Sequence, residues 1–216
     1  MTKAKSSREK ILDAAKAVMT EEGFAAVSSR RVAAKAGLKP QLIHYHFESM
    51  DHLLIELFTL LGNDVIEKQR SAIKSEHPLK DLWNLLSDRD MRVTLEQFLI
   101  MSRYNDDLQK KLGEFGNIFR HDQIAFLTDL MRENNFHSPH WSPEFLSILF
   151  NALARVIAIE PTYGLNLGIS EAMSTINHYI EQFDRGISSP EMTIKRLEHE
   201  NAQLRETISK LAQSNK

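Results

Sequence analysis

The 216-residue sequence contains no cysteine. This absence excludes a disulfide framework, a thiolate zinc site, an iron–sulfur cluster and a cysteine nucleophile. Long hydrophobic runs are also absent: the longest, from Phe145 to Ile159, contains Arg155 and is too short to span a membrane. The charged first ten residues lack the apolar core of a signal peptide, so we expect a cytoplasmic protein that does not contact membranes.

Motifs of catalysis and metal binding are missing as well. The sequence has no GxSxG, P-loop or HExxH, no GxGxxG after a strand, and no Glu followed by His three residues later. His137 and His140 have a loop spacing that could hold a metal, but no carboxylate-rich segment accompanies them, and we interpret them as a polar turn. The sequence therefore predicts a protein that is not an enzyme, with no metal and no cofactor.

Charge is unevenly distributed along the chain. The total is −2, which excludes a protein that is strongly basic throughout. Residues 1–47, however, carry nine Lys and Arg against four acids, a local charge of +5 that leaves −7 on the rest. Such asymmetry favours a small basic module attached to a larger acidic body.

Apolar residues recur with helical spacing in nearly every long segment, and no segment has the alternation of a strand. We predict an all-α fold. Helix-capping and helix-stop residues place the first helix from the capping box Ser6-x-x-Glu9 to Gly23, and the second from Ser28 to Gly37. Further helices are expected at 40–47, 49–75, 79–88, 90–104, 108–133, 143–159, 170–185 and 191–213.

The helices at 28–37 and 40–47 are joined by a tight, glycine-containing turn, as in a helix-turn-helix. On a helical wheel the second of them presents a face without acids, made of Pro40, Gln41, His44 and Tyr45. Side chains of Gln and His can bond base edges in the major groove. The alternative is a surface helix of an ordinary three-helix core.

The stretch from Arg8 to Leu54 resembles the tetracycline-repressor (TetR) family of bacterial transcription regulators. The resemblance lies in Ile11–Ala15, Gly23-Phe24, Val32-Ala33 with Ala36-Gly37, and Tyr45-His46-Phe47 followed by Leu53. It implies a homodimer with an N-terminal DNA-binding domain at 1–48 and an effector-binding and dimerisation domain at 49–187.

Position by position, the resemblance implies phosphate contacts for Ser28, Ser29 and Arg30, base contacts for Pro40, Gln41 and His44, and backbone anchoring by Tyr45 and His46. Two residues depart from the family pattern. Lys39 stands where a Ser or Thr N-cap is usual, and Met50 where a phosphate-binding Lys is common. We expect the second departure to weaken DNA binding and Lys39 to compensate for it.

Large apolar residues at helical spacing fill 79–185, and most such residues form packed core. The resemblance adds that some of them line a cavity for a small effector. The candidate walls are Trp83, Phe98, Met101, Phe119 and Phe126. The candidate polar groups are Arg103, Tyr104, His121 and Asp122, and Arg103 or His121 would suit an effector with a carboxylate.

The resemblance also places a four-helix dimer interface at 143–159 and 170–185. The predicted contact residues are Phe145, Leu149, Ala152, Val156, Tyr179, Ile180 and Phe183. The alternative is that these residues form the internal core of a monomer, which suits a reader of palindromic DNA less well because that task needs two half-sites.

The segment 188–216 has heptad spacing, with Ile194, Asn201 and Ile208 at a and Leu197, Leu204 and Leu211 at d. This pattern favours a parallel two-stranded coiled coil. The segment would then strengthen the dimer or recruit a partner. The alternative is an amphipathic helix packed on its own subunit.

Together these features predict a ligand-responsive, homodimeric transcriptional repressor. It would bind a palindromic double-stranded DNA operator and be released by a small hydrophobic effector. Two alternatives remain: a transcriptional activator of the same family, or a helical small-molecule carrier or enzyme that retains a helix-turn-helix. The acid-free face at 40–45 favours a DNA-binding regulator over a carrier.

Overall fold

The structure is a computed structural model that describes residues 5–134, 140–187 and 205. Within these residues the fold is all-α and contains no strand, as predicted. The elements are α1 (Ser7–Glu22), η1 (Phe24–Ala26), α2 (Ser29–Ala36), α3 (Gln41–His46), α4 (Met50–Ile73), α5 (Pro78–Leu86), α6 (Arg89–Ser102), α7 (Asp106–Glu133), α8 (Pro143–Ile159), η2 (Glu160–Tyr163) and α9 (Ile169–Ile187). The predicted helix at 191–213 and its coiled-coil positions lie outside the described residues.

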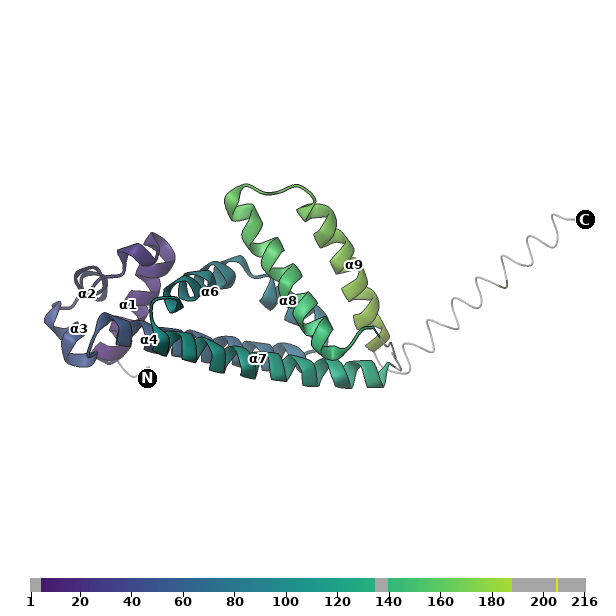
Figure 1. The fold of residues 1–216 in the computed structure, drawn as a ribbon, viewed down its shortest axis with the longest axis horizontal. Coiled ribbons are helices and arrows are strands. Elements are labelled where there is room, and N and C mark those ends of the chain that lie inside the picture. The colour runs from purple at the N-terminus through teal and green to yellow at the C-terminus, as the bar shows by residue number, and fades with distance from the viewer. Residues whose placement is uncertain (1–4, 135–139, 188–204, 206–216) are drawn as a thin grey trace, which may run out of the picture.

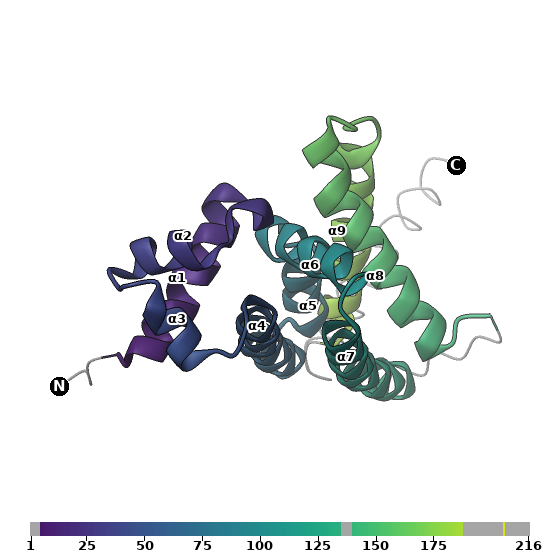
Figure 2. The same ribbon diagram turned by 60° about the vertical axis from the view of Figure 1, so that its left-hand side comes forward.

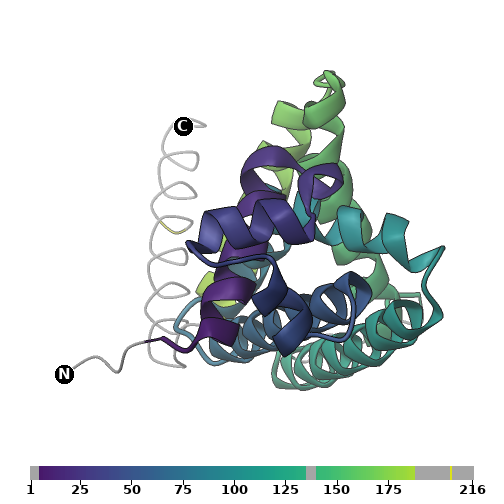
Figure 3. The same cartoon turned by 90° about the vertical axis from the view of Figure 1, so that its left-hand side faces the viewer.

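The short helices α1–α3 gather at one end of the molecule (Figure 1). From that end α4 extends alongside α7, the longest helix described. Helix α8 packs against α5, α6 and α7, and α9 packs against α5 (Figure 2). Figure 3 looks at the end formed by α1–α3 and shows these helices in front of the larger helical body. The fold therefore places α4 as the direct connection between the two parts.

The boundaries of the first helices follow from local capping groups. The Ser6 hydroxyl accepts from Glu9 N, and the Glu9 carboxylate accepts from Ser6 N at 2.7 Å, which completes the predicted capping box. Gly37 ends α2 with a φ of 68°, a left-handed conformation that glycine adopts without steric cost. Both predictions are confirmed.

Two clusters of buried side chains hold the fold together. The first joins α1–α4 and continues into α6 and α7 through Phe98 and Leu108. The second joins α5, the C-terminal half of α7, α8 and α9. The first cluster thus spans the predicted domain boundary at residue 48, so α4 and α6 contribute side chains to the same core as α1–α3.

One segment of the described chain, Pro143–Tyr163, is long and apolar enough to cross a membrane by length and composition. It includes α8 and the turn after it, and so extends beyond the apolar run from Phe145 to Ile159. Exposed apolar residues on a helix equally fit a protein–protein interface. A single segment of this kind does not by itself indicate a membrane span.

Candidate nucleic-acid interface and effector region

Helix α3 has one buried and one exposed face. Ile43 and Phe47 are 0% and 1% exposed and belong to the first core cluster. Gln41 and His44 are exposed, and Tyr45 is 80% exposed. The structure therefore presents the predicted base-reading side chains together on the solvent side. His46 is half-buried, and its ring lies edge-on to that of Tyr45 at 5.0 Å.

The start of α2 carries the predicted phosphate-binding residues. The Ser28 hydroxyl accepts from Arg31 N at 3.3 Å, so Ser28 is the N-cap, as predicted. Arg30 is exposed and makes no hydrogen bond or ion pair with the described residues. Arg31, by contrast, bonds both carboxylate oxygens of Glu22, which raises the pKa of Arg31 and lowers that of Glu22. The two neighbouring arginines are thus not equivalent: Arg30 is available to an anion and Arg31 is paired.

The two residues that depart from the family pattern lie in different environments. Lys39 is exposed, and α3 begins without a side-chain cap; the Lys39 carbonyl accepts from Leu42 N at 3.0 Å. Met50 is half-buried and packs against the first core cluster at the start of α4. Of the two, only Lys39 offers a cation to DNA.

A cluster at the junction of α1, α3 and α4 fixes the recognition helix. Arg8 forms an ion pair with Glu56, and its guanidinium lies 5.2 Å from the centre of the Phe47 ring. His52 Nε2 lies 3.2 Å from the other Glu56 oxygen. Sequence reasoning missed this cluster because Arg8 and Glu56 are 48 residues apart. The contacts link the C-terminal end of α3 to the first turns of α4.

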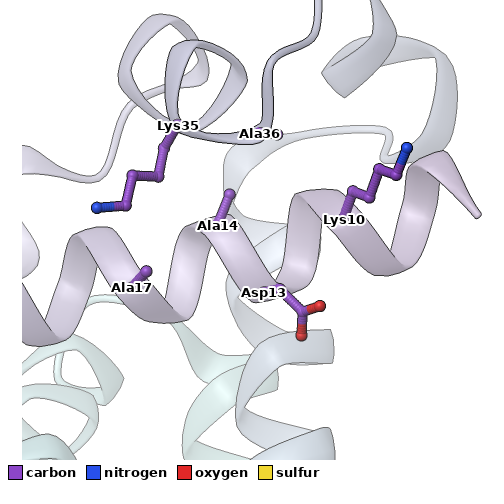
Figure 4. A pocket seen from close by; sticks show the side chains of 6 residues that line it. All are labelled: Lys10, Asp13, Ala14, Ala17, Lys35 and Ala36. Atoms are coloured by element: carbon purple, nitrogen blue, oxygen red, sulfur yellow. The ribbon is translucent and has the colours of Figure 1, made fainter. Parts of the chain in front are cut away.

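A shallow hollow lies between α1 and α2 on the DNA-binding end (Figure 4). Alanines form its floor because they leave space between the two helices. Two of the charged side chains at its edge are already paired, Lys35 with Glu21 and Asp13 with Lys5, each at 2.6 Å. The residues that line it are Lys10, Asp13, Ala14, Ala17, Lys35 and Ala36. None of the predicted effector contacts is among them.

The nine predicted effector contacts do not come together at one site. Phe98 and Met101 pack in the first core cluster, whereas Trp83, Phe119 and Phe126 pack in the second. The predicted polar groups Arg103, Tyr104 and His121 are exposed, and Asp122 is paired with Arg70 at 2.8 Å. The helical periodicity identified buried faces but gave no information on which faces meet.

A polar network between α6, α7 and α8 was not predicted. Arg92 and Gln123 are 7% and 1% exposed. The Gln123 Oε1 atom accepts from Ser147 Oγ at 2.8 Å and from Asn151 Nδ2 at 2.7 Å, and Asn151 Oδ1 lies 3.4 Å from Arg92 Nη2. A polar residue between apolar ones in a sequence suggests a solvent-facing position, so composition gave no signal for this network.

Most of the predicted dimer contacts on α8 and α9 are exposed to solvent in the single chain. Phe145, Val156, Tyr179 and Phe183 are exposed large side chains, as are Ile148 and Leu153, which were not predicted. Ala152 is exposed and Leu149 half-buried. Ile180 differs, because it is 5% exposed and packs into the second core cluster of its own chain. The predicted contacts Leu197, Asn201, Leu204 and Ile208 lie outside the described residues.

No group of three or more metal-ligating side chains occurs in the part of the chain that the structure describes. The arrangement that remains is a small helical module with an exposed, acid-free recognition face, joined through α4 to a larger helical body. This combination of fold and site defines a helix-turn-helix DNA-binding protein.

Comparison with known proteins identifies a family match in the N-terminal part of the chain. Residues 11–57 match the family described as bacterial regulatory proteins, tetR family. The match covers most of α1, all of α2 and α3, and the first turns of α4, so this N-terminal part of the chain has the pattern of the tetR family. No curated protein matches the chain.

Solved structures share the fold at low sequence identity. A regulator from Saccharomonospora viridis in complex with choline has a TM-score of 0.69 and 18% identity over 81% of this chain and 95% of that one. A TetR regulator from Haloarcula marismortui has a TM-score of 0.64 and 16% identity over 82% of this chain and 97% of that one. The fatty acid degradation regulator FadR from Bacillus halodurans has a TM-score of 0.62 and 19% identity over 83% of this chain and 96% of that one. At these identities the likeness concerns the fold alone.

Proposed function

We propose that the protein is a cytoplasmic, homodimeric repressor that binds a palindromic operator and releases it when a small hydrophobic effector binds. The observation that carries the DNA-binding part is the exposed face of α3, where Gln41, His44 and Tyr45 are accessible while Ile43 and Phe47 anchor the helix in the core. A helix of this kind enters the major groove with its polar residues toward the base edges.

The proposed contacts fall into two classes. Pro40, Gln41 and His44 face the bases, and Ser28, Ser29, Arg30, Lys39, Tyr45 and His46 face the sugar–phosphate backbone. Arg30 and Lys39 supply the positive charge, because neither is paired with an acid among the described residues. Phosphate contacts set position and affinity, whereas base contacts set sequence preference.

The exposed apolar residues of α8 and α9 support the homodimer. A twofold interface would bury the side chains of Phe145, Ile148, Val156, Tyr179 and Phe183 twice, once from each subunit. Two subunits place two recognition helices about one helical turn of DNA apart, roughly 34 Å, which is the geometry that a palindromic operator needs.

The proposed release mechanism acts through α4. Three residues separate this helix from α3, and it carries Glu56, the partner of Arg8. An effector that favours a different position of α4 would shift α3 in each subunit and change the separation of the two recognition helices. A ligand shifts such an equilibrium only by its difference in affinity for the two states.

The decisive experiment measures binding of the full chain to the DNA upstream of its own gene by fluorescence anisotropy at stated salt. We expect tight binding to a fragment with an inverted repeat and weaker binding when one half-site is scrambled. Equal affinity for a random duplex would contradict operator recognition. Expression of a reporter in a deletion strain distinguishes a repressor from an activator, since loss of a repressor raises expression and loss of an activator lowers it.

A further inference from the structure

Arg92 of α6 is a buried cation with neutral partners. Its Nε donates to the Leu86 carbonyl at the end of α5, and its Nη2 lies at a long 3.4 Å from Asn151 Oδ1. Neither partner carries a charge. An arginine residue that is only 7% exposed normally has a carboxylate partner, because a charge removed from water needs compensation.

The one carboxylate that acts on Arg92 is already engaged. Glu96 accepts from Arg155 Nε at 2.7 Å and from Arg155 Nη2 at 3.1 Å. The Glu96 carboxylate attracts Arg92 through its charge, but its hydrogen bonds go to Arg155, so Arg92 has no carboxylate hydrogen-bonded to it among the described residues. Burial and the charge of Arg155 lower the pKa of Arg92 to about 10, so Arg92 still carries its proton at neutral pH.

The network beyond Arg92 ends in a second unmatched donor. Asn151 Nδ2 donates to the Ser147 carbonyl at 2.9 Å and to Gln123 Oε1, while Asn151 Oδ1 faces Arg92. These bonds fix the orientation of the Asn151 amide. Because Asn151 and Ser147 both donate to Gln123 Oε1, the Gln123 amide is fixed as well, and its Nε2 is left buried without a hydrogen-bond partner.

The buried Gln123 Nε2 therefore lacks an acceptor at one end of the network, and Arg92 has N–H groups without a protein partner at the other. Arg92 has five N–H donors, only two of which have partners among the described residues, and Gln123 adds two more. Trp83, on the adjacent α5, also has a buried Nε1 without a partner, and its ring packs edge-on against Phe150 of α8. Donors that outnumber acceptors, a positive charge and aromatic neighbours together match one ligand class.

We propose that the effector is a small hydrophobic carboxylic acid whose carboxylate binds the guanidinium of Arg92. This inference rests on the proposed function and names the chemistry of its effector. A carboxylate supplies the missing negative charge and two acceptor oxygens in the geometry that a guanidinium matches. The residues that the sequence suggested for this role, Arg103 and His121, are exposed instead.

Calorimetric titration of the full-length protein with matched pairs of ligands tests the charge requirement. The probes are octanoate with octanamide, phenylacetate with phenylacetamide, and choline as a cation. We expect at least one acid to bind and its amide to bind about tenfold more weakly or worse, since a charge-assisted bond contributes more than a neutral one. An amide that matches its acid, binding of choline in preference to both acids, or binding of neither acid overturns the proposal.

Three variants locate the carboxylate. Arg92→Gln should weaken binding of the acid about tenfold or more. Arg92→Lys keeps the charge but loses the planar fork, so its affinity for the acid should lie between those of Arg92→Gln and the wild type. The matched control is Arg120→Gln, on an exposed arginine of α7, which should leave binding unchanged. If Arg103→Gln removes acid binding and Arg92→Gln does not, the assignment is wrong.

The same preparations separate this inference from the proposed function. Anisotropy with upstream DNA and no added acid tests operator binding alone. If the protein binds DNA but does not respond to acids, the proposed regulator function is supported and the proposed carboxylate site is wrong. If the protein binds acids but not DNA, the proposed carboxylate site is supported and the proposed regulator function is wrong. If circular dichroism shows that Arg92→Gln does not fold, the difference in affinity between each acid and its amide on the wild-type chain still tests the charge requirement.

Discussion

Gly62 of α4 lies directly against the ring of Phe115 of α7. A Cβ atom at Gly62 would stand 2.6 Å from Cδ1 of that ring, much closer than the 3.5–4.0 Å or so at which carbon atoms attract. Phe115 also packs edge-on against Phe58, with ring centres 5.4 Å apart. The absence of a side chain at Gly62 thus sets the distance between the two longest described helices, one of which leads directly to the recognition helix.

Replacing Gly62 with alanine should destabilise the protein. Overpacking against Phe115 costs about 1–3 kcal/mol, and the better helix propensity of alanine offsets about 1 kcal/mol of it. The matched control is Gly116→Ala in α7, where the new Cβ meets nothing within 4 Å and should stabilise the helix by about 1 kcal/mol. Urea denaturation of both variants measures the difference. Equal stabilisation by both changes would show that Phe115 moves aside without cost.

Local signals made the helices predictable from sequence. The capping box at Ser6 and Glu9, the N-cap Ser28 and the left-handed Gly37 each depend on residues a few positions apart. For the same reason, the helical wheel separated the exposed Gln41 from the buried Ile43 correctly. These interactions lie within one helix or one turn, so no knowledge of tertiary structure was needed.

The packing of distant helices was not predictable in the same way. Phe98 and Trp83 both belong to apolar faces, but they lie in different core clusters. Periodicity shows that a face is buried and carries no information on its partner. The burial of Arg92 and Gln123 depends on contacts between α5, α6, α7 and α8 that a single sequence does not reveal.

Arg30 and Arg31 should contribute differently to the salt dependence of DNA binding. Arg30→Ala should reduce the slope of log K against log salt by about 0.9 for each half-site, the value for one released counterion. Arg31→Ala should change that slope much less, because Glu22 already neutralises Arg31 in the free protein. Anisotropy titrations over a series of salt concentrations measure both. A larger change for Arg31 would mean that DNA breaks its ion pair with Glu22.

Gln41 and Tyr45 should separate sequence preference from general affinity. Gln41→Ala should cost about 1–3 kcal/mol on the operator and little on a random duplex, because it removes a contact to a base edge. Tyr45→Phe removes only a hydroxyl and should weaken binding to both duplexes equally. Competition titrations with the two duplexes give the ratio of the affinities for operator and random duplex. If operator and random duplex lose equal affinity in Gln41→Ala, its base-reading role is wrong.

A charge on the exposed face of α8 should dissociate the proposed dimer. Ile148→Glu removes an apolar side chain worth about 1.5–3 kcal/mol when buried, and twofold symmetry applies the loss twice. The dissociation constant should therefore rise at least about a hundredfold. Ile118→Glu, on an equally accessible site of α7, is the matched control. Analytical ultracentrifugation measures both, and an unchanged dissociation constant for Ile148→Glu would exclude this face from the interface.

Ser28 and Ser142 are two serine caps with nearly the same geometry. Each hydroxyl accepts from the backbone N–H three residues later, at 3.3 Å and 3.2 Å. Substitution of either serine by alanine should lower the free energy of unfolding by about 1 kcal/mol, the usual value of an N-cap. Thermal or urea denaturation of the unliganded variants measures this common loss.

The two caps should differ in their effect on DNA binding. Ser28 begins α2, where a phosphate is proposed to lie, whereas Ser142 begins α8 in the larger helical body. Ser28→Ala should therefore weaken binding to operator and random duplex by the same factor, while Ser142→Ala leaves both affinities unchanged. Because the two variants lose the same kind of cap, stability cannot account for a difference between them. Equal DNA affinities in the two variants would remove Ser28 from the phosphate contacts.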